Sequence, residues 1–415
     1  MPLKFHHHRL ANGLNVIAES DPDAHSFAAG LYVNTGSRDE PEKIGGVSHF
    51  LEHMMFKGSA RYTFEEVNRI FDEIGARYNA FTSQENTAYY ANVLPEFTAR
   101  AIAHLAQLLK PALRSNDFET EKKVILEEIA MHRDDPGYRI YEVLMRQHFG
   151  DHPLGRSVLG STESIRRLTR QQMRKYLTAH YGPDNTVLAA AGKIDFRQIV
   201  ALAEENCGSW KPSGAARHQA VPRYRARRKT LVDEKLKRQY TMAMTPGPSA
   251  QDTRRFAARV LGDVIGDAEG SRFYWALVDN AIAEEADFGF YPHDACGSFF
   301  FSLTTAPKRT AKALKIAIEE LSRVQTDLTE AEVERAKNKI ASSIVLDGET
   351  PMGRMRSIAA NWVYNKEYRS LESDMATLLA VSADSLRSLM RDFPFEPKTI
   401  VTLGPTRNPV IPARD

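Results

Sequence analysis

Residues 45–59 read GGVSHFLEHMMFKGS, and the spacing of their apolar side chains predicts a helix. These apolar residues form one continuous stripe at helical spacing: Val47, Phe50, Leu51, Met54 and Met55. At about 100° per residue, His49, Glu52 and His53 then share the opposite face. Two imidazoles one turn apart can both reach a single zinc ion, and a carboxylate between them can take a proton from a zinc-activated water. The alternative is a surface helix with an ordinary polar face, but the HxxEH pattern is expected by chance in at most roughly a few chains in a hundred.

A second predicted helix, from Asp117 to His132, offers a third ligand for a metal ion. Its apolar arc is built from four residues: Phe118, Val124, Ile125 and Ile129. At helical spacing Glu121 and Glu128 fall inside this arc, whereas Glu127 points away. Burying a carboxylate is costly unless it finds a cation or good hydrogen bonds, and zinc with two histidines needs a third protein ligand and an open position for water. We therefore favour a ligand role over the alternative, a salt bridge to a Lys or Arg at the edge of the core.

The composition is that of an ordinary globular protein. The chain has 415 residues, of which 42% are hydrophobic and 26% charged, enough for two or more domains with cores of their own. Its 55 Lys and Arg and 53 Asp and Glu leave a formal charge of +2, so no global field would hold it on nucleic acid or an anionic membrane. No apolar run reaches signal-peptide or membrane-span length. We expect a cytoplasmic protein, or a periplasmic one if a signal peptide has been removed.

The chain divides into two similar halves around a segment without periodicity. The first half shows a hairpin-like start, a strand in ENTAYYANVL and four predicted helices, at 46–57, 63–74, 97–109 and 117–132. After Trp210 the sequence is rich in Pro, Gly, Ala and Arg and has no apolar stripe. We predict an N-terminal zinc-binding domain at 1–212, a linker at 213–230 and a C-terminal domain at 231–415, each domain being of the α+β class.

The second half repeats the order of the first without its chemistry. Strands in QYTMAMT and GSFFFSLTT alternate with predicted helices at 256–266, 311–324 and 330–345. Both halves contain a charged helix followed by a break with Pro and Gly, and alignment there places Glu121 on Glu334 but Glu128 on Ala341. The second half also contains no HxxEH. A duplicated fold with its chemistry in one copy is therefore expected.

At this point the sequence resembles the inverzincins, the peptidase family of pitrilysin, insulin-degrading enzyme and mitochondrial processing peptidase, whose HxxEH inverts the zincin motif. Five segments carry the resemblance: GGVSHFLEHMMFKGS, YNAFTSQENTAYY, EKKVILEEI, LANGLNVIAES and HPLGRSVLGS. The length is similar to that of the half-sized bacterial and processing-peptidase branch. The resemblance implies two homologous α+β domains, each an antiparallel sheet packed with helices, that together form half of a clam-shell peptidase.

The resemblance also assigns roles to individual residues. It implies that one zinc ion per chain is bound by His49, His53 and Glu128, and that Glu52 activates the water. Glu121 matches a family glutamate that supports catalysis from beside the metal. A further segment matches one that holds the substrate backbone in an extended pose, a form of β-augmentation: Asn79, Ala80 and Phe81. The alternative for Asn79 is a turn residue.

The second half departs from the family pattern. Active relatives carry there an Arg and, a turn or two later, a Tyr, which bind substrate and stabilise the oxyanion. In residues 271–291 of this chain, Val278 or Asp279 stands in place of the Arg, and Glu284 or Glu285 in place of the Tyr. Arg272 and Tyr274 are candidate substitutes, but their spacing differs from the family's. The resemblance therefore implies a heterodimer in which a homologous subunit supplies the Arg/Tyr pair, or otherwise a homodimer.

These observations predict a zinc metalloendopeptidase that cleaves peptides or unfolded, presequence-like segments, with Glu52 as general base. A missing oxyanion donor costs a factor of about 10²–10³ in rate, so the chain alone should be weak. A noncatalytic scaffold subunit of a larger complex is the alternative from another functional class. Strict processing at one site and general degradation of peptides are not separated by the sequence.

Overall fold

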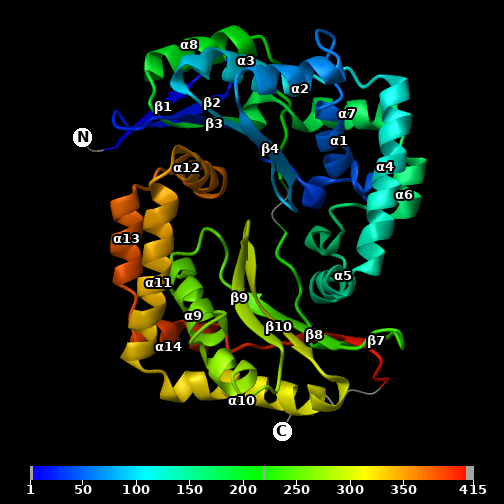
Figure 1. Cartoon of the computed structure of the whole chain (residues 1–415), viewed down its shortest axis with the longest axis vertical. Coiled ribbons are helices and arrows are strands. Elements are labelled where there is room, and N and C mark those ends of the chain that lie inside the picture. Colours follow the sequence, from blue (N-terminus) through cyan, green and yellow to red (C-terminus); the bar gives the residue numbers. More distant parts are fainter. Residues whose placement is uncertain (1–2, 218–219, 408–415) are drawn as a thin grey trace. The chain divides into compact units, whose positions relative to one another are not determined.

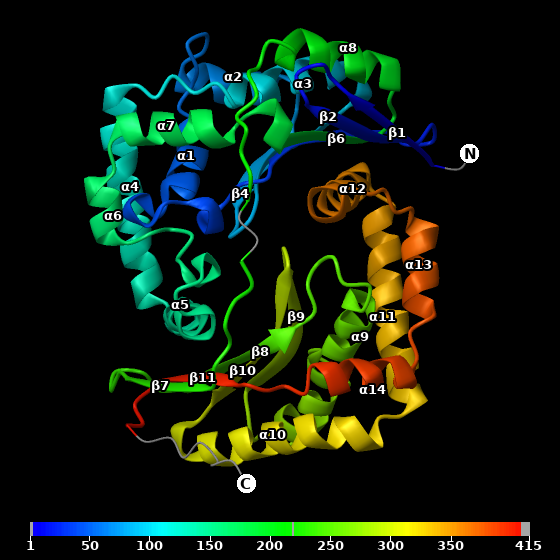
Figure 2. The same ribbon diagram turned by 180° about the vertical axis from the view of Figure 1, so that it is seen from behind.

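The computed structural model describes residues 3–217 and 220–407, which form two compact units. Of the described residues, the first unit comprises 3–130, 156–217 and 345–369, and the second comprises 131–155, 220–344 and 370–407. Each unit contains one sheet and its own helices (Figures 1 and 2). The predicted α+β class, with two homologous domains, is confirmed by the two sheets.

The first unit is built on a six-stranded sheet in the order β1-β2-β6-β3-β5-β4. Its strands are β1 (Lys4–Arg9), β2 (Asn15–Ser20), β3 (Phe27–Val33), β4 (Arg77–Thr82), β5 (Thr87–Val93) and β6 (Thr186–Gly192). All neighbours pair antiparallel except β2 and β6, which are parallel. The sequence suggested a purely antiparallel sheet, and the parallel pair of β2 and β6 departs from that expectation. A long helical connection precedes β6, and such a connection can return the chain in either direction.

Helices cover both faces of this sheet. Its helices are α1 (Val47–Met55), α2 (Phe64–Glu73), α3 (Thr98–Leu108), the first part of α4 (Ser115–Asp134), α6 (Thr162–Arg167), α7 (Arg170–His180), α8 (Phe196–Cys207) and α12 (Pro351–Asn365). The α3 and α8 helices lie over one face and α12 over the other (Figure 1). Residues of α12 such as Met355 and Ile358 share a core with Tyr32 and Tyr90 of the sheet.

The second unit has a five-stranded sheet in the order β7-β11-β8-β10-β9, in which only β7 and β11 pair in parallel. Its strands are β7 (Arg227–Val232), β8 (Gln239–Gly247), β9 (Glu285–His293), β10 (Cys296–Thr305) and β11 (Thr399–Gly404). Its helices are α5 (Pro136–Phe149), α9 (Arg255–Gly266), a π-helical turn (Tyr274–Val278), α10 (Thr310–Asp327), most of α11 (Glu330–Gly348), α13 (Leu371–Leu379) and α14 (Ala383–Asp392).

The two units are not the contiguous ranges 1–212 and 231–415 that the sequence suggested. The α5 helix packs in the core of the second unit, and α12 packs in the core of the first. Each follows a long helix, α4 or α11, and each begins at a proline, Pro136 or Pro351. The charged helix and Pro/Gly break seen in both halves of the sequence therefore mark two of the places where the chain passes between units.

The expected linker at 213–230 is only partly irregular. Residues 218 and 219 lie outside the described residues, and strand β7 already begins at Arg227. Before the gap, the Arg217 guanidinium is buried and pairs with Asp39 at 2.9 Å. The segment is thus anchored to the first unit at one end and to a strand of the second at the other.

Candidate metal centre

The α1 helix buries its apolar stripe, and two residues of its polar face, His49 and His53, face Glu128 of α4. All five stripe residues are buried as predicted: Val47, Phe50, Leu51, Met54 and Met55. The Phe50 ring stacks on Phe118 of α4, with 4.8 Å between ring centroids. This packing fixes α1 beside α4, so that His49 and His53 emerge on the side where the two helices meet.

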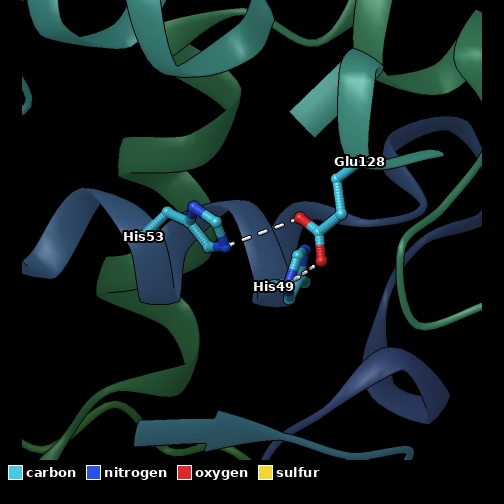
Figure 3. A group of neighbouring side chains, drawn as sticks. All are labelled: His49, His53 and Glu128. Carbon is cyan, nitrogen blue, oxygen red and sulfur yellow. Dashed lines mark ion pairs between the residues drawn. The ribbon is translucent and has the colours of Figure 1, made fainter. Parts of the chain in front are cut away.

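Three side chains converge between these helices (Figure 3). The Nε2 atom of His49 lies 3.7 Å from Oε1 of Glu128, and Nε2 of His53 lies 3.7 Å from the other oxygen of the same carboxylate. The three possible ligand atoms all lie within 4.8 Å of one another. Two imidazole nitrogens and one carboxylate oxygen at these separations fit a tetrahedral zinc ion that keeps a fourth position open, since zinc binds such ligands at about 2.0–2.2 Å.

Glu121 orients one of the histidines. Its Oε1 lies 2.8 Å from Nδ1 of His53, and its Oε2 lies 2.6 Å from the Lys57 ammonium. Because a carboxylate can only accept, Nδ1 carries a proton, and when the ring is neutral the lone pair of Nε2 faces Glu128. Glu121 is only 4% exposed, and burial raises its pKa, but the His53 and Lys57 hydrogen bonds outweigh burial and hold the pKa below its usual value.

The pKa of His53 is raised by its surroundings. Burial alone lowers it, but the hydrogen bond to Glu121 and the negative charge of Glu128 outweigh burial. In the metal-free protein this histidine therefore holds a proton more tightly than usual, and a cation must displace that proton to bind.

Glu52 lies on the same face of α1 as the two histidines, but its carboxylate is hydrogen-bonded to strand β4 and not to α4. The Thr82 hydroxyl of strand β4 donates to Oε2 of Glu52 at 2.6 Å. Burial raises the pKa of Glu52, and the Thr82 hydrogen bond opposes that rise. A carboxylate with a raised pKa beside a metal-binding group is suited to accept and return a proton near neutral pH.

The predicted substrate-binding segment lies on an edge strand. Asn79, Ala80 and Phe81 are in the middle of β4, which pairs with β5 and with no other strand of the described residues. Asn79 and Phe81 are exposed, while Ala80 and Thr82 alternate to the other face. Asn79 is therefore a strand residue and the turn alternative is wrong. An edge strand offers backbone groups of the kind that an extended peptide can pair with, and in this strand the Ala80 amide already donates to Oδ1 of Asn79 at 2.8 Å.

Three features of the sequence-based picture need correction. Helical spacing favoured a ligand role for Glu121 as well as Glu128, but Glu121 instead pairs with Lys57 at 2.6 Å and with Nδ1 of His53 at 2.8 Å, which is the salt-bridge alternative. Val124 was placed in the buried arc of α4, but its side chain is 42% exposed, because the helix buries Phe118, Glu121, Ile125 and Ile129 instead. Arg272 was a candidate substitute for a substrate-binding arginine. Its guanidinium is instead held by Glu332 and Asp327, at 2.7 Å and 2.5 Å, and is largely buried.

Thr82 and Lys57 are site residues that the sequence reasoning missed. Each contacts a carboxylate of the site, Glu52 and Glu121 respectively. Period-two alternation from Asn79 would have placed Thr82 on the opposite face from Phe81, which is a usable signal. Lys57 lies just beyond the end of α1, four residues after His53, so helical spacing in the predicted helix at 46–57 would have placed it on the face of the two histidines, which is also a usable signal.

Sequence models of two domains match the chain in succession. Residues 15–162 match the model described as insulinase, peptidase family M16, and residues 167–340 match the model described as the peptidase M16 inactive domain. The chain belongs to peptidase family M16. The resemblance seen in the sequence is thereby confirmed, and the description of the second M16 domain as inactive agrees with the absence of HxxEH from that half.

Curated M16 relatives match over nearly the whole length. An uncharacterised zinc protease of Streptomyces coelicolor is 30% identical over 96% of this chain and 89% of its own. The uncharacterised zinc protease YmxG of Bacillus subtilis is 28% identical over 96% of this chain and 97% of its own. The chain is therefore of the half-sized M16 kind.

Solved structures share the fold. A protease from Helicobacter pylori has a TM-score of 0.90 at 20% identity, covering 97% of this chain and 100% of its own. A putative M16-like peptidase from Alicyclobacillus acidocaldarius has a TM-score of 0.83 at 23% identity, covering 97% and 98%. A chain of complex III from Candida albicans also reaches a TM-score of 0.83, at 19% identity over 97% and 96%. Within residues 3–217 and 220–407, no helix is long and apolar enough to cross a bilayer.

Proposed function

We propose that this M16 chain is a zinc metalloendopeptidase in which His49, His53 and Glu128 bind the metal and Glu52 is the general base. The observation that carries the proposal is the convergence of the three donor groups to within 4.8 Å, with Glu52 on the same face of α1. The names of the relatives as zinc proteases support the choice of metal.

The chain's own residues divide the work of peptide hydrolysis. When bound, zinc supplies a Lewis acid that polarises the scissile carbonyl and lowers the pKa of a water molecule. Glu52 accepts the proton of that water and then returns it to the leaving amine, while Thr82 holds the carboxylate in place. Glu121 keeps His53 in the tautomer and orientation that binding requires.

Substrate recognition is assigned to β4. A peptide added to its free edge lies extended beside Asn79, Ala80 and Phe81, and alternate side chains of the peptide face the two sides of the sheet. Because backbone pairing is independent of sequence, this mode suits short peptides and unfolded, presequence-like segments.

A second subunit completes the proposed enzyme. Residues 271–291 lack the Arg/Tyr pair of active relatives, and the nearest candidate, Arg272, is held by two carboxylates. We propose a heterodimer with a homologous subunit that carries the pair, with a homodimer as the alternative. A scaffold role without catalysis would leave unexplained the convergence of three metal-binding groups, His49, His53 and Glu128, with Glu52 on the same helix face.

Hydrolysis of a quenched-fluorescent peptide library by the zinc-loaded chain tests the catalytic assignment. We expect Glu52→Gln to lower kcat by a factor of about 10²–10⁴ while one zinc ion stays bound, because only the proton acceptor is lost. Glu127→Gln, the same change at an exposed site on α4, should have no effect. Unchanged turnover in Glu52→Gln would show that another group is the base.

The same assay tests the need for a partner. The chain alone should be slower than the chain mixed with its homologous subunit by a factor of about 10²–10³, the usual cost of a missing oxyanion donor. Sedimentation of the mixture should show a one-to-one complex. Full turnover by the isolated chain at a concentration where it sediments as a monomer would contradict the partner.

A further inference from the structure

The α1 helix begins without a capping side chain of its own. Its N-cap residue is Gly46, with φ of 89°, and no side-chain hydrogen bond is made from that position. A Cβ atom at Gly46 would meet the backbone oxygen of Leu159 at 2.5 Å. A Ser, Thr, Asp or Asn cap is therefore excluded by both conformation and space, and the first N–H groups of the helix need another acceptor.

Glu40 provides that acceptor from six residues earlier in the chain. Its Oε2 accepts from the backbone N–H of Gly46 at 2.6 Å, and its Oε1 accepts from the backbone N–H of Ser48 at 2.7 Å. One carboxyl group thus satisfies two amides at the first turn of α1 with two short hydrogen bonds. The side chain is buried, with 2% of its surface exposed.

The cap is itself anchored to the rest of the first unit. The Arg156 guanidinium donates to the backbone oxygen of Glu40 at 2.5 Å. The Ser48 hydroxyl lies 2.7 Å from the hydroxyl of Tyr176 on α7, which in turn lies 3.3 Å from the Thr35 hydroxyl. The start of α1 is therefore tied to α7 and to the loop after β3.

A buried carboxyl is an energetically costly cap for the start of a helix. Burial raises the pKa of Glu40 to about 8, against the lowering effect of the backbone hydrogen bonds from Ser48 and Gly46. At an exposed helix start, water can accept hydrogen bonds from the first N–H groups without the desolvation of a carboxyl. The arrangement implies that the position of this particular helix end matters.

We propose that Glu40 is a positioning residue for the metal centre: it fixes the first turn of α1 and thereby the placement of His49 relative to Glu128. The proposal rests on the zinc-binding role proposed above. His49 directly follows Ser48, whereas Glu128 belongs to α4, so any shift of the first turn changes the 3.7 Å separation between the two side chains. His53, one turn later and held by Glu121, should be less sensitive.

Glu40→Gln tests the proposal, because it keeps the shape but replaces one acceptor oxygen with an amide donor facing a backbone N–H. The matched control is Glu42→Gln, the same change at an exposed site two residues away. Zinc affinity is measured by competition with a chromophoric chelator, and ligand geometry by the visible absorption of the cobalt-substituted chain. We expect zinc binding to weaken by about 10–100-fold in Glu40→Gln, with an altered cobalt spectrum, and to stay within twofold in Glu42→Gln.

Tyr176→Phe is the second variant, for use if Glu40→Gln does not fold. It removes the hydroxyl that holds Ser48 and should weaken zinc binding in the same direction by a smaller factor. A fall in thermal stability with zinc affinity and cobalt spectrum unchanged would show that Glu40 is only structural, and would overturn the proposal.

Failure of the metal assignment is distinguished in the metal-free chain. If the wild type binds no zinc, the proposed function fails, and hydrogen exchange of the α1 amides then decides about Glu40 alone. Faster exchange at the first turn of α1 in Glu40→Gln, but not in Glu42→Gln, supports its control of the helix end. Equal exchange in both variants overturns it.

Discussion

At the scale of single residues, the site depends on side chains that hold the reactive groups. Glu52 carries the proposed proton transfer, yet burial raises its pKa and works against the charged form. The Thr82 hydroxyl offsets this with one short hydrogen bond from the neighbouring strand. Hydrogen bonds to charged groups contribute about 1.5–3 kcal/mol, so a single hydroxyl is enough to matter for the rate.

Thr82→Val should therefore lower kcat by roughly tenfold or more, because Glu52 loses the hydroxyl donor that holds its orientation and opposes the rise of its pKa. Zinc content and KM should stay close to those of the wild type, since Thr82 contacts none of the three ligands. Thr82→Ser keeps the hydroxyl and should recover most of the rate. Equal kcat in Thr82→Val and wild type, measured by steady-state peptide hydrolysis, would remove Thr82 from the mechanism.

At the scale of elements, the position of α1 depends on a glycine that no other residue can replace. Gly46 has a positive φ. A Cβ atom at this position would also lie only 2.5 Å from the backbone oxygen of Leu159. Gly75, at the end of α2, also has a positive φ of 59°, but a Cβ there meets nothing within 4 Å. Alanine substitutions at these two glycines therefore separate the free-energy cost of a positive φ from the cost of a steric clash.

Gly75→Ala should cost about 1–2 kcal/mol of unfolding free energy, the usual penalty of a left-handed conformation. Gly46→Ala adds an overpacking cost of about 1–3 kcal/mol, because the Leu159 backbone has to move. Urea unfolding followed by fluorescence should thus rank Gly46→Ala well below Gly75→Ala in stability. Equal losses in the two variants would mean that the loop at Leu159 yields freely and does not fix α1.

Elements with strong periodicity could be predicted from the sequence, and elements that depend on long-range packing could not. The helices expected at 46–57, 63–74, 97–109 and 117–132 are α1 to α4, within a few residues. The three zinc-ligand candidates and Glu52 followed from helical spacing together with the family resemblance. Val124, Thr82 and the membership of α5 and α12 were missed or misplaced, because each depends on which neighbour packs against it.

At the scale of the whole molecule, the two units each contain a helix from the other half of the chain. The α5 helix is held in the second unit by His148, which is buried with Nε2 at 3.0 Å from the Ser298 hydroxyl and Nδ1 at 3.4 Å from that of Thr399. Burial, with the nearby His293 and Arg227, lowers the pKa of His148 to about 3. The folded protein therefore keeps this histidine neutral.

The stability of the chain should fall as pH falls below about 6.5. The unfolded state binds a proton at His148 in this range while the folded state does not, so protons favour unfolding until the folded pKa is reached. Between pH 7 and pH 5 this amounts to about 2 kcal/mol. Urea unfolding of His148→Gln should lose that part of the pH dependence, and His8→Gln, at an exposed histidine, should keep it. Parallel pH curves for all three proteins would contradict the account.

The zinc site itself is tested most directly by metal binding in a pair of neighbouring variants. Zinc stoichiometry and affinity are measured by isothermal titration for the wild type, Glu128→Gln and Glu127→Gln, which differ only in whether the altered carboxylate faces His49 and His53. We predict one zinc ion per chain in the wild type and in Glu127→Gln, and an affinity at least about 100-fold weaker in Glu128→Gln. Equal zinc affinity in the two variants, or no zinc in the wild type, would contradict the assignment of the site.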